Sequence, residues 1–213
     1  MTRPIVFVLA GVNGAGKSTA GGHELTRAGL TWFNPDSYAR SLVTKLGYPQ
    51  EQANGIAWKK GVEQLETALA NGLDYAFETT LGGNTIVAKL RQATATHDVV
   101  MWFCGLDSPE HHMARVRFRV SKGGHDIPEE KIRERYSTSL ANLTTLLPQL
   151  AQLQVYDNSV DAVPGKPMPN PRLLLQMEAG RITWPIDTGT LRQTPDWAKP
   201  VLEAALQLHA RQP

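Results

Sequence analysis

An apolar run followed at once by a glycine-rich octapeptide constrains this chain more than any other feature. Residues 11–18 read Gly-Val-Asn-Gly-Ala-Gly-Lys-Ser, which matches the pattern G-x-x-x-x-G-K-[ST], and they directly follow the apolar residues 5–10. A buried strand, a glycine-rich turn and a helix start bring backbone N–H groups and a helix N-terminus onto one anion. The alternative is an ordinary glycine-rich turn, but the flanking pattern favours a phosphate-binding loop in an α/β fold.

The loop predicts how a nucleotide would be held. Glycines allow the backbone to approach a phosphate closely. We expect Lys17 to reach the β- and γ-phosphates and the Ser18 hydroxyl to ligate Mg²⁺. The implied cofactors are ATP and Mg²⁺, although the sequence does not separate ATP from GTP. The residues expected to bind the nucleotide are Gly11, Asn13, Gly14, Ala15, Gly16, Lys17, Ser18, Thr19 and Arg115.

The composition is that of a compact enzyme. With 213 residues the chain can form one α/β domain with a substantial core. Lys plus Arg number 22 and Asp plus Glu number 20, so no global field attracts nucleic acid or a membrane. No stretch approaches 18 apolar residues, and the single Cys104 is expected to be buried and inert. A cytoplasmic location is the expectation.

Apolar runs alternate with helical patterns, as in a five-stranded, mainly parallel sheet with helices on both faces. Strands are predicted at Ile5–Ala10, Thr31–Asn34, Tyr75–Glu78, Val99–Gly105 and Leu153–Tyr156. Helices are predicted near Lys17–Ala28, Asp36–Leu46, Gln50–Asn71, Asn84–Thr94, Pro109–Lys122 and Pro128–Leu147. We expect a core over 1–160, and a small appendage over 161–213 with a hairpin at Leu173–Met177 and Arg181–Trp184 and a helix at Val201–His209.

An acidic motif ends the second predicted strand. Asp36 follows Asn34-Pro35 where a helix should begin. It could act as an N-cap, accepting a backbone N–H. It could instead be a general base that accepts the proton of a hydroxyl as that oxygen attacks a γ-phosphate.

A second acidic motif, Phe77-Glu78-Thr79-Thr80, ends the third predicted strand. Glu78 could hold Mg²⁺ through a water or bind a substrate hydroxyl, and Thr79 and Thr80 add further polar groups. The alternative is that these residues start the next helix. A carboxylate and small hydroxyls opposite the glycine-rich loop would suit a polyhydroxylated acceptor such as a sugar better than an apolar one.

Two basic helices flank Gly123-Gly124-His125 and suggest a hinged lid at about 109–147. Arginine forks can neutralise charge on a transferring phosphoryl group while a closed lid excludes water. The alternatives are a solvated basic surface or an RNA-binding patch. The lid arginines expected to reach the phosphates are Arg119 and Arg135, followed by Arg133 and Arg115.

Other polar residues remain less defined. His111 and His112 are adjacent and are expected on a solvated helix surface rather than in a metal site. His125 lies in the glycine hinge and could touch a phosphate. Asp157 and Asn158 could contact the adenine or cap a strand edge.

Taken in order, these motifs resemble the zeta toxin family of P-loop kinases. The resemblance covers roughly residues 3–160 and includes the loop, both acidic motifs, the stretch from Arg119 to Asn142, and Val155-Tyr156-Asp157-Asn158-Ser159. It implies a P-loop kinase fold and ATP-dependent phosphorylation, in characterised toxins at the 3′-hydroxyl of UDP-N-acetylglucosamine. This chain is similar to compact chromosomal members.

The resemblance also implies site roles and a partner. Lys17 and Ser18 would hold the phosphates and Mg²⁺, Asp36 would be the base, and Glu78 and Thr80 would lie at the sugar-nucleotide site. The catalytic set is then Asp36, Lys17, Arg119, Arg135 and Arg133. The toxins are held inactive by a small antitoxin or antitoxin domain, so an antitoxin partner is implied.

Three functions remain open from the sequence. The favoured function is a kinase acting on a small molecule, a UDP-sugar above all. A polynucleotide or other 5′-hydroxyl kinase is the second, and the near-neutral charge argues against it. The third is a nucleotide-dependent binding module that signals through its lid.

Overall fold

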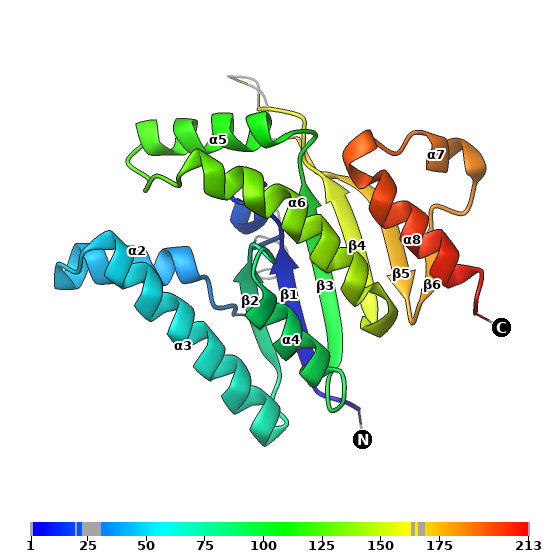
Figure 1. The fold of residues 1–213 in the computed structure, drawn as a ribbon, viewed down its shortest axis with the longest axis horizontal. Helices are drawn as coiled ribbons and strands as arrows, with labels where there is room; N and C mark the ends of the chain where they lie inside the picture. Colours follow the sequence, from blue (N-terminus) through cyan, green and yellow to red (C-terminus); the bar gives the residue numbers. More distant parts are fainter. Residues whose placement is uncertain (1, 20, 23–30, 163–164, 166–168, 213) are drawn as a thin grey trace.

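Four parallel strands carry the apolar runs of the N-terminal part of the chain. They are β1 (Ile5–Ala10), β2 (Tyr75–Thr79), β3 (Asp98–Gly105) and β4 (Gln152–Asp157). The computed structural model describes residues 2–19, 21–22, 31–162, 165 and 169–212. Its sheet has the order β2-β1-β3-β4-β5-β6 (Figure 1). The chain passes from β1 to β2 on one side and later to β3 on the other, which makes the end of β1 the topological switch point.

The sheet has six strands, so the predicted number of five was wrong. The hairpin of β5 (Arg172–Glu178) and β6 (Arg181–Trp184) pairs antiparallel with β4 and extends the sheet. The predicted strand Thr31–Asn34 is a single bridge between Phe33 and Phe77. The physical reason is that Asn34 already caps the helix that starts at Pro35, so the backbone leaves the ladder after one pairing.

The predicted helices among the described residues are present with shifts of a few residues at their ends, and the short helix at Thr188–Arg192 was not predicted. Residues 17–19 and 21–22 are helical, and the rest of the predicted helix Lys17–Ala28 lies outside the described residues. The others are α2 (Pro35–Leu46), α3 (Gln50–Asn71), α4 (Asn84–Ala93), α5 (Pro109–Ser121), α6 (Glu129–Leu146), α7 (Thr188–Arg192) and α8 (Lys199–His209), with short 3₁₀ turns η1 (Leu147–Gln149) and η2 (Asp196–Ala198).

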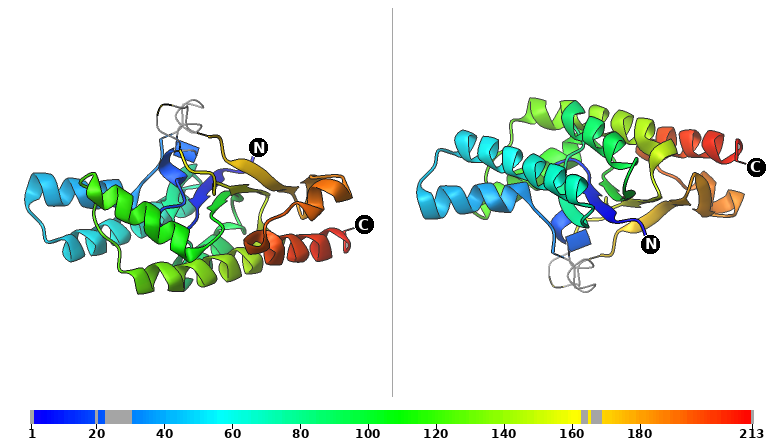
Figure 2. Two further views of the ribbon diagram at one scale, coloured as in Figure 1. Left: turned by 90° about the horizontal axis from the view of Figure 1, so that it is seen from above. Right: turned by 90° about the horizontal axis from the view of Figure 1, so that it is seen from below.

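Helices cover both faces of the sheet. Figure 2 shows α6 and α8 on one side and the helical residues 17–19 and 21–22 on the other. Because side chains alternate along a strand, one face of the sheet points into the main core. There Val8, Met101 and Val155 are buried in the same cluster as Leu143 and Leu202 of the covering helices.

Helices α2 and α3 form a hairpin beyond β2 (Figure 1), and Leu65 of α3 belongs to the main core. They share a small apolar cluster of their own, built around Ala39, Leu42, Ala53 and Ala57. Asn34 caps the start of α2, and Gly47 ends it in the left-handed conformation with φ 69°. The hairpin is thus an arm with its own packing, joined to the sheet beside β2.

The C-terminal segment shares the main core. Trp197 of η2 lies against Gly105 at the end of β3, where an added Cβ would come within 2.3 Å of the indole ring. The ring centroids of Trp197 and Phe103 are 6.4 Å apart. Residues from 161–213 therefore support the strand that leads into α5, and the division at 160/161 stays a prediction.

We predict that Trp197→Ala lowers the free energy of unfolding by about 3–5 kcal/mol, because it leaves a cavity behind β3. Trp197→Phe should be much milder, since the indole N–H has no hydrogen-bond partner among the described residues. Trp184→Ala is the matched control at an indole 40% exposed and should cost less than about 1 kcal/mol. Urea denaturation measures all three, and equal losses at Trp197 and Trp184 would contradict the packing argument.

Candidate active site

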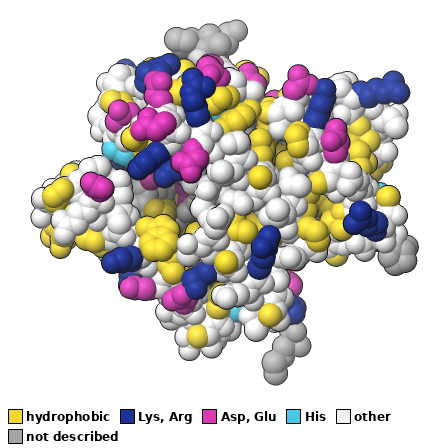
Figure 3. All heavy atoms as spheres, viewed as in Figure 1, with side chains coloured by type: hydrophobic (Ala, Val, Ile, Leu, Met, Phe, Trp, Pro, Cys, Tyr) yellow, Lys and Arg dark blue, Asp and Glu magenta, His cyan; other side chains and the backbone are white. Residues whose placement is uncertain are grey.

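A cleft opens at the carboxyl edge of the parallel strands. Its volume is about 1300 Å³, and its walls come from the glycine-rich loop, from α2 and α5, and from the segment after β4. The surface is hollowed between the α2–α3 arm and the α5–α6 pair (Figure 3). Pockets for one drug-sized ligand measure roughly 300–1,000 Å³. The cleft is therefore large enough for two substrates side by side.

The glycine-rich loop adopts backbone angles that only glycine accepts readily. Gly11, Gly14 and Gly16 have φ values of 138°, 85° and 82°. Each also lies against a neighbouring segment. An added Cβ would come within 2.1 Å of the Cys104 carbonyl oxygen at Gly11, and within 2.7 Å of the His112 carbonyl oxygen at Gly14. The glycines thus fit the loop between β3 and α5.

His112 supports the loop from inside the protein, so the expected solvated position was wrong for this residue. Its side chain is 1% exposed, and Nδ1 lies 2.8 Å from the Asn13 carbonyl oxygen. Because a carbonyl can only accept, Nδ1 must carry the hydrogen. Burial lowers the pKa of His112 to about 4. A neutral imidazole therefore holds the loop at pH 7.

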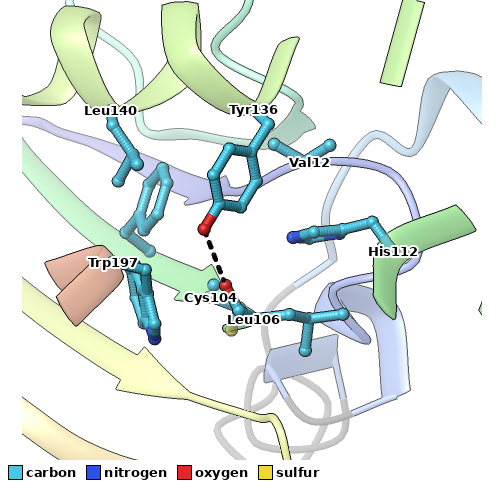
Figure 4. Close-up of a pocket in the computed structure, with 9 residues that line it drawn as sticks. Val12, Cys104, Leu106, His112, Tyr136, Leu140 and Trp197 are labelled. Atoms are coloured by element: carbon cyan, nitrogen blue, oxygen red, sulfur yellow. Dashed lines mark hydrogen bonds between the residues drawn. The ribbon is translucent and has the colours of Figure 1, made fainter. Parts of the chain in front are cut away.

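A very small cavity of about 10 Å³ lies beneath the loop, lined by Val12, Cys104, His112 and Tyr136 among others (Figure 4). The Tyr136 hydroxyl of α6 points at the chain after β3, 3.5 Å from the Leu106 carbonyl oxygen and 3.1 Å from that of Asp107. Cys104 is buried, as expected, and burial raises the pKa of its thiol to about 12. Tyr136 thus anchors the chain beside the loop, and Cys104 remains a protonated, unreactive thiol.

Asn158, after β4, braces the loop from its other side. Its Nδ2 donates to the Ala15 carbonyl oxygen at 2.9 Å. Asp157 instead accepts from the backbone N–H of Ser159 at 3.2 Å and from its hydroxyl. Both residues thus have contacts within the protein, and the adenine contact considered for them stays a prediction.

A buried polar network joins the loop to β2. The Lys17 ammonium, 6% exposed, lies 3.5 Å from Oε1 of Glu78, which is 7% exposed. The Ser18 hydroxyl donates to Oε2 of Glu78 at 2.8 Å, and Asn34 Nδ2 donates to the same oxygen at 2.8 Å. The carboxylate therefore organises the lysine, the serine and the start of α2 at once.

Asn34, and not Asp36, caps α2. Asn34 Oδ1 accepts from the Ser37 N–H at 3.0 Å. This leaves the Asp36 carboxylate at the cleft, where its side chain is 41% exposed. It lies 3.7 Å from an Arg119 nitrogen and 4.0 Å from Nε2 of His125. His125 thus faces Asp36, and burial is the main cause that lowers its pKa.

Thr79 and Thr80 hold the turn after β2. The Thr79 hydroxyl accepts from the Leu81 N–H and the Thr80 hydroxyl from the Gly82 N–H. They do not start α4, whose N-cap is Gly83. Neither residue lines the cleft as Glu78 does, so a substrate-binding role for these two hydroxyls stays a prediction.

The four predicted arginines occupy different places. Arg119 and Arg115 line the cleft, paired with Asp36 and with Asp161, which lies 2.8 Å from Arg115. Arg135 donates to Asn13 Oδ1 at 2.8 Å and so reaches the loop. Arg133 does not join them. Its side chain is 52% exposed and pairs with Glu110 on the outer surface.

Sequence reasoning missed two residues that organise the site. Asn34 was treated as part of a turn, although an Asn two residues before Asp36 and next to Pro35 is itself a cap signal. His112 gave no such signal, because only the packing of α5 against the loop buries it.

Metal-ligating and membrane features are limited. Within the described part of the chain, no cluster holds three or more His, Cys, Asp or Glu side chains suited to a metal ion. No helix among the described residues is long and apolar enough to cross a membrane. The Ser18 hydroxyl of the loop and the Glu78 carboxylate place two hard oxygen donors 2.8 Å apart.

Similar proteins support this description. No protein-family model matches the chain. An uncharacterized protein of Haemophilus influenzae is 29% identical over 135 residues, which cover 59% of this chain and 88% of that protein. A crystal structure of AvrRxo1-ORF1:-ORF2 with ATP aligns with TM-score 0.64 and 13% identity, over 96% of this chain and 64% of that one. The chain thus spans less than two thirds of that neighbour.

A structure from the PezAT chromosomal toxin–antitoxin system of Streptococcus pneumoniae aligns with TM-score 0.51 and 16% identity, over 74% of this chain and 68% of that one. At these identities the similarities show the fold. They confirm the mainly parallel α/β fold, of the P-loop kinase type, that the sequence predicted.

We predict that the folded chain loses stability as the pH falls from about 6.5 to 4, in part through His112. Burial lowers the pKa of His112 from 6.5 to about 4 in the folded chain. Between these two pH values His112 is therefore protonated in the unfolded chain and neutral in the folded one. The contribution is on the order of 3 kcal/mol at full titration.

The measurement is urea unfolding at several pH values for the wild type and for His112→Gln, which keeps a donor but does not titrate. The difference in unfolding free energy between the two should shrink by this amount toward pH 4. Parallel pH profiles of the two proteins would rule the assignment out.

Proposed function

We propose that this protein is a phosphotransferase that moves the γ-phosphate of ATP to a hydroxyl of a small molecule, most specifically a UDP-sugar such as UDP-N-acetylglucosamine. The observation that carries the proposal is the position of Asp36. Its carboxylate is not used as a helix cap and faces the cleft, opposite the glycine-rich loop. A binding module would need no carboxylate there, whereas a kinase needs one to accept the hydroxyl proton.

The loop would hold the nucleotide. Backbone N–H groups of 11–18 and the N-terminus of the helix at Lys17 would bind the phosphates, with Lys17 exchanging its contact with Glu78 for phosphate oxygens. The pair of Ser18 and Glu78 fits Mg²⁺, since a hydroxyl and a carboxylate oxygen 2.8 Å apart are hard oxygen donors. When bound, the ion would neutralise charge on the phosphates.

The chain's own residues then suggest the transfer step. As the acceptor oxygen forms its bond to the γ-phosphorus, its proton passes to Asp36, and the bond from phosphorus to the bridging oxygen breaks to release ADP. Arg119, near the end of α5, lies 3.7 Å from the Asp36 carboxylate and would exchange it for the transferring phosphoryl group. Arg135 contacts the loop through its hydrogen bond to Asn13 Oδ1.

The UDP-sugar acceptor and an antitoxin partner rest on the zeta toxin resemblance. The two structural neighbours support a partner, because one was solved as an ORF1:ORF2 complex and the other belongs to a toxin–antitoxin system.

Activity on a polynucleotide has less support. Acidic and basic side chains are interspersed over the α5–α6 end (Figure 3), and Arg115, Arg117 and Arg133 are paired with carboxylates.

We predict that the wild type transfers labelled phosphate from ATP with Mg²⁺ to a UDP-sugar within a panel of UDP-sugars, nucleosides and oligonucleotides. Lys17→Ala should lose ATP binding and transfer. Asp36→Asn should keep ATP binding and lose transfer by roughly 10²–10⁴-fold, because it removes only the proton acceptor.

The matched control is Asp196→Asn, an exposed aspartate 93% accessible and remote from the cleft, which should transfer normally. Release of free phosphate alone would favour the nucleotide-dependent switch. Undiminished transfer by Asp36→Asn would overturn the assignment of the base.

A further inference from the structure

The turn between α5 and α6 brings a histidine to the proposed general base. Gly123 has the left-handed φ of 85°. At Gly124 an added Cβ would come within 2.7 Å of the Arg119 side chain and within 2.9 Å of the Arg119 carbonyl oxygen, so the chain folds back closely over the end of α5. The next residue, His125, then reaches Asp36 at the start of α2.

The two oxygens of the Asp36 carboxylate have different neighbours. Oδ2 lies 3.7 Å from a guanidinium nitrogen of Arg119, and Oδ1 lies 4.0 Å from Nε2 of His125. Arg119 also donates to the His125 carbonyl oxygen at 3.3 Å, which links the arginine to the turn that carries the histidine. Both contacts to Asp36 are longer than hydrogen bonds, as is common at catalytic groups before the substrate binds.

The surroundings of His125 favour a neutral imidazole, because its side chain is only 10% exposed and burial is the largest cause that lowers its pKa. Arg119 and Arg40 lower this pKa further, whereas the carboxylates of Asp36 and Asp126 raise it. A neutral imidazole can donate from Nε2 to a carboxylate oxygen without cancelling the charge of the carboxylate. An imidazolium would instead form an ion pair and make the carboxylate a weaker proton acceptor.

We propose that His125 is a positioning residue for the general base, and that the two oxygens of Asp36 have separate tasks. His125 holds Oδ1 through its Nε2–H, while Arg119 moves from Oδ2 to the transferring phosphoryl group. Oδ2 then takes the proton of the acceptor hydroxyl as that oxygen bonds to the γ-phosphorus and the bond to the bridging oxygen breaks to release ADP. The inference rests on the proposed kinase function and deepens it.

The first test measures the contact without any transfer reaction. NMR follows the imidazole signals of the full chain against pH, with His125→Gln to assign the signal of His125. Asp36→Asn should lower the pKa of His125 further, because it removes a carboxylate that raises this pKa. The control His209→Gln removes an exposed histidine of α8 outside the cleft lining and should leave it unchanged. An unchanged pKa of His125 in Asp36→Asn would overturn the inference.

The second test is the pH profile of kcat for transfer from ATP with Mg²⁺ to UDP-N-acetylglucosamine, or to whichever hydroxyl compound the kinase assay identifies. His125→Ala should lower kcat roughly 10- to 100-fold, because the carboxylate loses its fixed orientation. His125→Gln keeps an N–H donor and should stay within roughly 3-fold of the wild type at about pH 8. Toward about pH 5 the wild type should lose kcat faster than His125→Gln, since only the histidine becomes charged beside Asp36.

The outcomes separate this inference from the kinase function. Transfer by the wild type with parallel pH profiles for the wild type and His125→Gln, or with full activity of His125→Ala, would overturn the inference and leave the kinase function standing. Absence of transfer to every acceptor would overturn the kinase function and the catalytic role of His125 together, even where NMR shows the contact with Asp36. Matching urea midpoints of the variants will exclude a folding defect as the cause of a lower kcat.

Discussion

The buried pair of Lys17 and Glu78 is the interaction on which the rest of the site depends. A buried ammonium and a buried carboxylate are each costly to remove from water, and their 3.5 Å contact offsets that cost only with further hydrogen bonds. Ser18 and Asn34 supply those bonds to the carboxylate. Since Asn34 also caps α2, the same carboxylate ties the phosphate-binding loop to the arm that carries Asp36. If a phosphate replaced Glu78 as the partner of Lys17, the change would reach the start of α2 through the Glu78–Asn34 hydrogen bond.

The loop itself is held by elements that come from distant parts of the sequence. His112 of α5 and Asn158 after β4 bind two of its carbonyl oxygens, and Tyr136 of α6 anchors the chain beyond β3. Trp197 supports the end of β3 from below. Backbone donors that are fixed in advance need no reordering when an anion arrives, which is the source of their electrostatic advantage. The C-terminal segment thereby contributes to the site without reaching the cleft.

The cleft separates two kinds of positive charge. Arg115 and Arg119, from α5, are paired with carboxylates and would have to exchange partners to meet a phosphate. Arg40, from the α2–α3 arm, has no such partner among the described residues. The cleft therefore presents both ion-paired and unpaired guanidinium groups.

The sequence alone was enough to predict the glycine-rich loop between a strand and a helix, the alternation of strands and helices, and the placement of Asp36 and Glu78 at the carboxyl edge of the sheet, because these depend on local spacing and apolar periodicity. It did not determine the number of strands, since Phe33 pairs for only one residue and the β5–β6 hairpin joins the sheet through a contact distant in sequence. Tertiary structure also decided that Asn34 caps α2 in place of Asp36, that Arg133 faces outward, and that His112 is buried under the loop. The physical reason is that local pattern specifies which side of a helix or strand is apolar, whereas the partner of each polar group depends on which elements the folded chain brings together.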